Sequence, residues 1–366
     1  MAPLMLEYKP HCSEVLERLA SLYAGQAGER IFATLRVPSP ALAAFAEAHP
    51  AGPCECPDPI ERADFWDRLC RERAAVEDDS LPAAYLSELD QGLYGGLLGG
   101  QVRFLCGAVP GWISSMVPPL LTDWSQLDAL RLDESHPWWQ RYLEQLQLFA
   151  ARAAGRWGVS HFIIVDSLNF VIELLGATQT YLSLDEHPEQ VRRAIDLGYE
   201  LNVRVHEAFF EAVGLFQGGT FSNYGQWLPG RIVSESLDPF HLTSVACFEQ
   251  WGREPAERIL GHFDGGVVHI HANGRHLLKA AATLRGLRLL ELMDDTGLPP
   301  TFDVLEKLKS VTGQVPLSCP ASFAPFVERL ERHTLPGGVL YHVAGVPDAD
   351  TANRLMEKVR AYKNDQ

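Results

Sequence analysis

Two histidines stand one residue apart in the stretch GGVVHIHANGRHLL, residues 265 to 278. The apolar run before them predicts a buried strand, and residues two apart on a strand point to the same side, so His269 and His271 can present both imidazoles together near its carboxyl end. Neutral imidazoles at this spacing can bind zinc, which in a catalytic site takes a third protein ligand and keeps one open position. Two alternatives stay open on the residues alone: the histidines orient a substrate through hydrogen bonds without a metal, or their role is structural.

Three residues are candidates for the third ligand, and each ends a predicted strand or begins the loop after it. They are His342 in LYHVAG, Cys319 in VPLSC and Asp294 in LRLLELMDD. None stands at a diagnostic spacing. We therefore predict a metal site formed by His269 and His271, with His342 first among the candidates for the third ligand.

Polar residues also follow other predicted strands. They are Asp166 and Asn169 after HFIIV, Asn223, Tyr224 and Trp227 after LFQGGTF, and Asp294 and Asp295 after LRLLEL. Each Asp or Asn alone is also explained as a helix cap, because these residue types are preferred there. Together they indicate a pocket, with Asp166 as a catalytic candidate and with substrate-binding candidates at Asn169, Asn223, Tyr224, Trp227 and Asp294.

Two arginines are candidates for binding an anionic group. Arg275 lies in the first turn of a predicted helix, where the helix dipole disfavours a cation, so we expect it to face an anionic ligand or a carboxylate. Arg36, at the end of the first predicted strand, has the same two interpretations. The sequence has no GxGxxG, Walker or GxSxG pattern, so nothing in it indicates nucleotide binding or serine hydrolysis.

From residue 138 onward, helical periodicity alternates with short apolar runs. The predicted strands are 161–166, 215–221, 266–271, 287–292, 315–319 and 337–343, and the predicted helices are 138–158, 188–214, 239–260, 273–285, 301–313, 322–333 and 348–362. Six parallel strands at this spacing fit a doubly wound sheet or most of a barrel. Two further candidates, residues 30–37 and 101–109, bring the count to eight and favour an α/β fold of one (β/α)8 TIM-type barrel.

We expect a single domain over residues 1–366, in which residues 1–100 form an N-terminal extension with the first strand and residues 101–366 the main part of the barrel. Residues 38–100 are rich in Pro, Gly and acidic residues and are interpreted as a loose connection.

The composition excludes several classes of protein. There are 31 Lys and Arg against 47 Asp and Glu, and the net charge of −16 disfavours nucleic acid and anionic lipid surfaces. No apolar run is long enough for a membrane span, and the N-terminus does not resemble a signal peptide. Seven scattered cysteines do not form a disulfide framework. We expect a cytoplasmic protein, and a homo-oligomer is compatible with these features.

Several motifs between residues 115 and 362 together resemble the uroporphyrinogen decarboxylase superfamily, which includes methyltransferases that move methyl groups between corrinoid proteins and thiols. In order, they are LLTDWSQLDAL, the helix start DEHPEQVRRAI, SESLDPF, VHIHANGRHLL and the closing GGVLYHVAGVPDADTANRLM. The resemblance implies a single β/α barrel with its active site at the carboxyl ends of the strands.

In the methyltransferase branch, a His-x-Cys pair and a Cys of the last strand hold zinc, which activates a thiol. Here the pair becomes His269 and His271, and the Cys position falls near Ala344, two residues after His342. The decarboxylase branch uses an arginine-rich N-terminal strand and an aspartate, and RIFATLRV with Arg36 is similar to that strand only in part.

Three hypotheses follow for the function. The first is a metal-assisted, zinc-using methyltransferase-like enzyme that acts on a small molecule, with a separate corrinoid protein as partner if a corrinoid donates the methyl group. The second is a metal-independent decarboxylase or lyase of the same fold that uses His and Asp as acid and base. The third is a barrel that binds a small anion without turnover. Metal content separates the first hypothesis from the other two.

Overall fold

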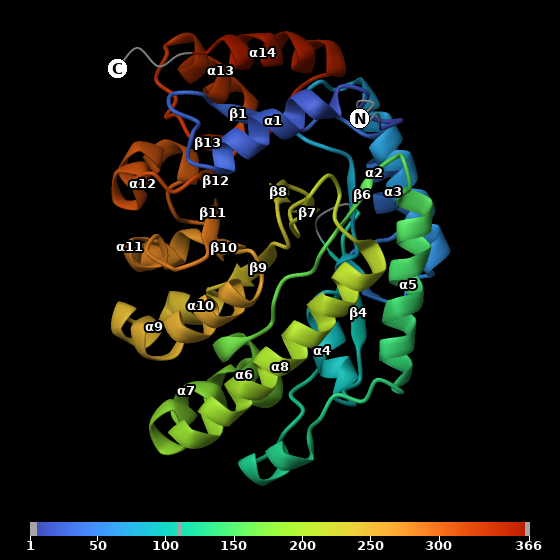
Figure 1. The fold of residues 1–366 in the computed structure, drawn as a ribbon, viewed down its shortest axis with the longest axis vertical. Helices are drawn as coiled ribbons and strands as arrows, with labels where there is room; N and C mark the ends of the chain where they lie inside the picture. The colour runs from blue at the N-terminus through green and yellow to red at the C-terminus, as the bar shows by residue number, and fades with distance from the viewer. Residues whose placement is uncertain (1–5, 108–110, 363–366) are drawn as a thin grey trace.

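A parallel sheet of six strands organises the C-terminal half of the protein, in a computed structural model that describes residues 6–107 and 111–362 (Figure 1). All five strand pairs in it are parallel. In spatial order its strands are β1 (Phe32–Leu35), β13 (Val339–Ala344), β12 (Leu317–Ser322), β11 (Leu287–Leu292), β10 (Gly266–Ile270) and β9 (Val233–Ser236).

One face of this sheet, which we call the inner face, changes from apolar to polar along the strands. On β10, Val267 and His269 point to the inner face, because alternate residues of a strand share a side. At the amino ends of the strands this face joins a buried cluster with α1 (Cys12–Tyr23) and the hairpin of β7 (Gly219–Phe221) and β8 (Trp227–Pro229). The register places polar residues at the carboxyl ends of the same face: Thr34, His269, Glu291, Ser318 and His342.

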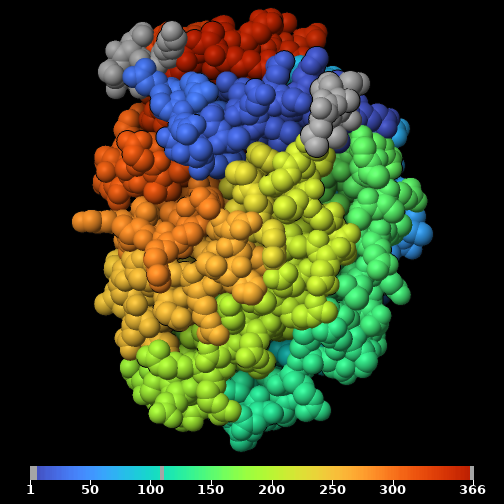
Figure 2. All heavy atoms as spheres, viewed as in Figure 1, coloured from blue at the N-terminus to red at the C-terminus, as the bar shows by residue number. Residues whose placement is uncertain are grey.

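Helices cover the opposite, outer face of the sheet, where Val268 and Ile270 belong to the largest buried cluster. Their amphipathic sequences alternate with the strands, as predicted. They are α9 (Val245–Trp251), α10 (Arg253–His262), α11 (Leu278–Ala281), α12 (Leu305–Thr312), α13 (Phe323–Glu331) and α14 (Ala349–Ala361), with single-turn segments η4 (Asp238–Leu242), η5 (Ala272–Leu277) and η6 (Thr301–Val304). Figure 2 shows the N-terminal segment, in blue, lying against α14, in red.

A second sheet of four strands contains β3 (Ala83–Tyr85), β6 (Gly158–Ser160), β7 and β8. A parallel bridge between Ile163 and Ser234 links the end of β6 to β9. The long helices α5 (Pro137–Ala153) and α8 (Pro188–Val213) run beside each other along this part of the molecule, with α6 (Ser167–Leu175) and α7 (Ala177–Glu186) packed against α8 (Figure 1). This bridge places the residues that follow β6 next to β9.

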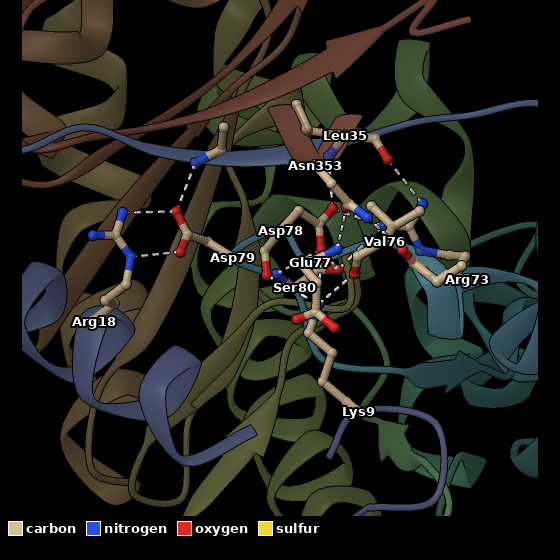
Figure 3. Close-up of polar contacts among 12 residues, drawn as sticks. Lys9, Arg18, Leu35, Arg73, Val76, Glu77, Asp78, Asp79, Ser80 and Asn353 are labelled. Carbon is tan, nitrogen blue, oxygen red and sulfur yellow. Dashed lines mark hydrogen bonds and ion pairs between the residues drawn. The ribbon is translucent and has the colours of Figure 1, made fainter. Parts of the chain in front are cut away.

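Two adjacent aspartates tie β1 to the segment that leads into β3 (Figure 3). The Asp79 N–H donates to the Ala33 carbonyl at 2.9 Å, and the Ala33 N–H donates to the Asp79 carboxylate at 3.0 Å. The Leu35 N–H donates to the Asp78 carboxylate at 2.7 Å. These carboxylates therefore accept backbone hydrogen bonds that a neighbouring strand would otherwise receive. We call this group the aspartate clasp.

Cations neutralise both carboxylates of the aspartate clasp. Arg18 of α1 donates to both oxygens of Asp79, at 2.6 and 3.0 Å. Lys9 and Arg73 contact Asp78, at 3.4 and 2.8 Å. Burial opposes ionisation of Asp78, but these cations, the Leu35 N–H and Ser80 outweigh it and leave its pKa below the usual range.

The prediction of a barrel strand at 101–109 is wrong. Within the described part of it, β4 (Arg103–Cys106) pairs antiparallel with β2 (Gly52–Cys54) and β5 (Ile113–Met116) in a separate three-stranded sheet. Residues 108 and 109 lie outside the described residues. The alternating pattern of VRFLC fits a half-buried antiparallel strand as well as a parallel one, and only the pairing partner decides between them.

Residues 38–100 are more ordered than the predicted loose connection. They contain α2 (Pro40–Ala48), α3 (Pro59–Glu72), η1 (Arg73–Ala75), β3, η2 (Ser87–Leu89) and α4 (Gln91–Leu97). Pro stands at the start of both α2 and α3, after the capping residues Ser39 and Asp58.

Other differences concern element bounds and one strand. The observed strand β6 ends at Ser160, so the predicted strand 161–166 lies after it. The predicted helix 239–260 is divided into η4, α9 and α10, with the break between α9 and α10 at Gly252. β9 was not predicted, because its sequence VSES lacks the apolar run of a buried strand. Among the described residues, no helix has the length and apolarity needed to cross a membrane.

Candidate metal centre and adjoining cavity

Three side chains that can donate to a metal converge at the carboxyl ends of β9 and β10. Asp238, His269 and His271 each offer one ligand atom, and these atoms all lie within 4.8 Å of one another. The two imidazole rings have their centroids 4.5 Å apart. The sequence prediction that both histidines face the same region therefore agrees with the structure, and Asp238 occupies the place of the third donor.

His269 is held by β10 and by one tyrosine. The Tyr224 hydroxyl lies 2.6 Å from His269 Nδ1, and His269 Nε2 lies 3.9 Å from an Asp238 oxygen. Burial, with the nearby charge of His271, lowers the pKa of His269 to about 3. The imidazole is therefore neutral at physiological pH and able to bind a metal through Nε2.

His271 is held by a carboxylate from the next strand's loop. Its Nδ1 lies 2.9 Å from the Asp295 carboxylate, which leaves Nε2 for another contact. Asp295 also accepts from the Asn273 N–H at 2.9 Å, which fixes the carboxylate in turn. Such a carboxylate–imidazole contact orients metal-binding histidines in many metalloproteins.

Asp238 begins η4, directly after β9. Its backbone N–H donates to the Ser236 hydroxyl at 3.3 Å, and its carboxylate lies 3.5 Å from His241 Nδ1. Partial burial raises the pKa of Asp238 above its usual value, and this effect outweighs the opposing effects of the His271 charge and the Ser236 hydroxyl. His241 is a third imidazole, beside the group, and burial together with the charge of His271 lowers its pKa to about 4.

The donor set fits zinc. Imidazole and carboxylate groups are zinc ligands, and a carboxylate orients one of the two imidazoles here. With three protein donors, a fourth position is available for a substrate, as catalytic zinc sites require.

His342 lies on the inner face of the sheet but outside this group of three. Its Nδ1 lies 2.7 Å from the Thr34 hydroxyl, and its Nε2 lies 2.6 Å from the Ser318 hydroxyl. Both ring nitrogens are thus engaged by protein hydroxyls. Glu291 adds a carboxylate 3.6 Å from Nε2. Burial opposes ionisation of Glu291, but His342, Gln226 and Ser318 outweigh it and lower its pKa.

Asp166 is turned away from the histidines. It precedes α6 and lies fully buried against Glu235 of β9. Glu235 is aligned with Val268, which belongs to the outer face. Burial raises the pKa of Asp166 to about 6, and burial and the Asp166 charge raise that of Glu235 well above its usual range. Burial thus favours the neutral form of both carboxyl groups behind the sheet.

A cavity of about 210 Å³ lies at the carboxyl end of β9, and Asp238, His269 and His271 are not among its lining residues. Ser236, aligned with His269 in the sheet, forms part of its wall, and Asn169 donates from its side chain to the Ser236 carbonyl at 2.8 Å. The remaining lining residues come from α4, the β5 end, the β6 end and α6: Gln91, Met116, Val117, Pro119, Ile163, Ile164, Val165, Ile172 and Glu173. Asn169 was predicted to bind substrate, and it lies in this wall.

The other residues predicted from the sequence lie in several places. Asn223 is buried beside β9, with its N–H 3.4 Å from the Ser234 hydroxyl. Trp227 packs in the apolar cluster with α1, away from the polar end of the sheet. Cys319 is fully buried, and burial raises the pKa of its thiol well above the usual range, so it lies in the core as a thiol.

The two predicted anion-binding arginines differ in their surroundings. Arg275 donates to the Pro299 carbonyl and the Thr301 hydroxyl and lies 3.8 Å from Asp294. Asp294 in turn accepts from the Thr301 N–H at 2.6 Å. Arg36 is exposed after β1, where its backbone N–H bonds to Val343. Arg275 thus has protein partners, and Arg36 faces solvent.

Sequence reasoning missed Asp238, His241 and Glu173. Asp238 stands in SESLDPF, where an Asp-Pro pair begins a helical turn after a strand end. The strand was not recognised, so the position of Asp238 at the site was not either. Glu173 stands four residues after Asn169 on α6, which places both on one face of the helix.

Comparison with known proteins gives a likeness of fold. No protein-family model matches the chain. No curated protein matches its sequence. Among solved structures, the chain is similar to a methyltransferase from Methanosarcina mazei, with a TM-score of 0.61 and 13% sequence identity, over 95% of this chain and 98% of that chain. At this identity the likeness shows a shared mixed α/β fold.

Proposed function

We propose that the protein is a zinc-dependent, methyltransferase-like enzyme that acts on a small molecule, with a fold of the uroporphyrinogen decarboxylase superfamily. The observation that carries the proposal is the convergence of Asp238, His269 and His271 beside a cavity. The solved methyltransferase structure that is similar over 95% of this chain supports the proposal. The motifs that resemble the superfamily, SESLDPF and VHIHANGRHLL, contain all three donor residues.

In this proposal the eight strands β1, β3, β6, β9, β10, β11, β12 and β13 form one closed barrel in a single domain. Two contacts support the closure. The Ile163–Ser234 bridge joins the β6 end to β9, and the aspartate clasp joins β1 to the segment before β3. The substrate would then bind at the carboxyl ends of the strands, as in other barrel enzymes.

The protein's own residues have distinct roles in this mechanism. Asp238, His269 and His271 would hold the ion, while Tyr224 and Asp295 orient the two imidazoles. A bound zinc ion supplies Lewis acidity that makes a thiol or water nucleophilic at neutral pH. Asn169 and Ser236 form the cavity wall against which the substrate lies. If a corrinoid donates or accepts the methyl group, it belongs to a separate partner protein.

The alternative of a metal-independent decarboxylase or lyase has less support. Its expected acid or base, Asp166, lies against Glu235 on the outer face. The carboxylates beside the histidines are Asp238, which completes a metal-binding set, and Asp295, which orients His271.

Methyl transfer tests the proposed function directly. Zinc-loaded protein is incubated with methylcob(III)alamin and a small thiol such as 2-mercaptoethanesulfonate, and the cobalamin absorbance is followed. We expect thiol-dependent loss of the methyl group from cobalt, with the thioether as product, and no such loss with His271→Ala. Absence of transfer by the zinc-loaded wild type with a panel of small thiols and methyl donors would contradict the proposal.

A further inference from the structure

Among the described residues, the carboxyl group of Glu173 has no counter-ion. It lines the cavity beside the metal-binding group, and its Oε1 is covered from solvent without a hydrogen-bond partner in the described part of the chain. An uncompensated buried carboxylate is costly, so a group of this kind is expected to stay neutral or to meet a cation supplied from outside.

Other buried acids of this protein show how the chain neutralises such groups. Asp78 lies against Lys9 and Arg73, and Asp79 against Arg18. Glu88 lies 3.2 Å from Arg62. Asp166 and Glu235 lie against each other on the outer face, without an ion pair to a cation among the described residues. In the described residues, Glu173 has no ion pair of this kind, although it faces a cavity.

A second acid lies near Glu173 and adds to the negative potential. Asp90, at the start of α4, is buried, and its charge acts on Glu173. Its carboxyl group contacts the Ile163 N–H, at 3.3 Å, and Tyr85. No ion pair joins Asp90 to a cation among the described residues. Glu173 in the cavity wall and Asp90 near it are therefore two acids without an ion pair among the described residues.

The wall of the cavity also bears on what could bind at Glu173. Gly95 of α4 has no side chain and so leaves room for the Glu173 carboxyl group itself, since a Cβ built there would lie 2.3 Å from Glu173 Oε1. The remaining wall is mostly apolar, from Met116, Val117, Ile164 and Ile172. An apolar wall around an acid suits an alkylated ammonium group, whose methyl groups are apolar and whose charge is positive.

We propose that the cavity binds a small alkylated amine as substrate, with its positively charged nitrogen paired to the Glu173 carboxylate. The other end of such a molecule reaches the wall formed by Ser236 and Asn169, beside the metal-binding group. This inference rests on the proposed function for the identification of the cavity as a substrate site. It adds the chemical class of the substrate.

Binding of the cation would displace a proton from Glu173. Burial, with the Asp90 charge, raises the pKa of Glu173 to about 8, and the Gly95 backbone only partly offsets this. The free site is therefore mostly protonated near neutral pH, and an arriving cation favours the ionised form. A neutral ligand that accepts a hydrogen bond from the protonated acid would release no proton, which separates the two kinds of ligand.

A matched pair of probes tests the inference. Choline and 3,3-dimethylbutan-1-ol have the same shape, but choline carries a positive nitrogen where the alcohol has carbon. Calorimetric titration of each into the full-length, zinc-treated protein is repeated in two buffers of different ionisation enthalpy. We expect choline to bind at least about tenfold more tightly than the alcohol, with release of a proton.

Two variants complete the test. Glu173→Gln keeps the size of the side chain, and we expect it to bind both probes with equal affinity and without proton release. Glu235→Gln removes a buried acid that does not line the cavity, and we expect it to prefer choline as the wild type does. Circular dichroism of each variant shows that it is folded.

Two results would overturn the inference: equal affinities of the wild type for both probes, or no binding of either. Zinc content is measured on the same samples, so the two proposals can fail separately. Stoichiometric zinc without choline preference contradicts the amine inference alone. Choline preference without zinc binding contradicts the proposed zinc-dependent function and leaves a cation-binding cavity.

Discussion

The Tyr224 hydroxyl lies 2.6 Å from Nδ1 of His269, and this contact directs the other ring nitrogen toward Asp238. Asp295 makes the equivalent contact to Nδ1 of His271, at 2.9 Å. Both histidines are thus oriented through the nitrogen that does not face the centre of the group. This arrangement is expected where an ion is held by two imidazoles.

Asp295→Asn and Tyr224→Phe should weaken zinc binding without abolishing it. Removing a group that orients a metal-binding histidine typically costs about 10 to 100-fold in metal affinity. Competition with a chromogenic chelator measures the affinity of each variant. His276→Ala is the control, because its imidazole contacts the Thr243 carbonyl outside the site. Wild-type affinity in both test variants would argue against a role for these contacts.

Breaking the aspartate clasp should destabilise the protein strongly. Asp79→Ala leaves the Ala33 N–H without its acceptor and Arg18 without its partner. Loss of one member of a buried ion pair typically costs about 3 to 5 kcal/mol. Denaturant unfolding measures the change. In the control Asp64→Ala, the exposed pair with Arg152 is broken, and a cost below about 1 kcal/mol is expected. Equal effects of the two substitutions would show that the clasp is not important for stability.

Glu173 should make the stability of the protein depend on pH. Burial raises its pKa from 4.5 to about 8. Between these values the folded protein keeps a proton that the unfolded chain releases, so the free energy of unfolding falls as the pH rises through this window. Glu173→Gln should reduce this fall, while Asp90, with a pKa raised to about 7 by burial, maintains part of it. Unfolding curves at several pH values test this, and identical slopes for variant and wild type would contradict it.

Gly95→Ala should close the cavity at the Glu173 end. The new Cβ would lie 2.1 Å from Val117 Cγ2 and 2.3 Å from Glu173 Oε1, so the neighbours must move. Overpacking of this kind typically costs about 1 to 3 kcal/mol. We expect weaker choline binding together with a lower unfolding free energy. Gly261→Ala is the matched control, because its Cβ would meet nothing within 4 Å in α10. Unchanged choline binding by Gly95→Ala would place the ligand elsewhere.

The sequence allowed much of the parallel sheet to be predicted, because its pattern is local. The sequences of β10, β11, β12 and β13 are short apolar runs between amphipathic helices. Each of these runs forms a strand in the structure. β9 could not be predicted, because two serines and a glutamate make up most of this buried strand and it therefore has no apolar run. The antiparallel pairing of β4 could not be predicted either, because it depends on partner strands elsewhere in the sequence.

The site could be predicted only as far as local spacing determines it. His269 and His271 share a strand end, so their convergence follows from the period of a strand. Asp238 reaches them from the neighbouring strand β9, and that contact depends on the β9–β10 register. His342 was preferred as third ligand because it ends a strand of the same sheet. The structure instead surrounds it with Thr34 and Ser318.

The central claim is that Asp238, His269 and His271 hold a zinc ion. Elemental analysis of untagged protein, after zinc loading and removal of loosely bound metal, tests it most directly, with Asp238→Ala, His271→Ala and His342→Ala beside the wild type. We predict near-stoichiometric zinc in the wild type and in His342→Ala, and its loss in the other two variants. Wild-type protein without zinc, or zinc that depends on His342 and not on Asp238, would contradict the account.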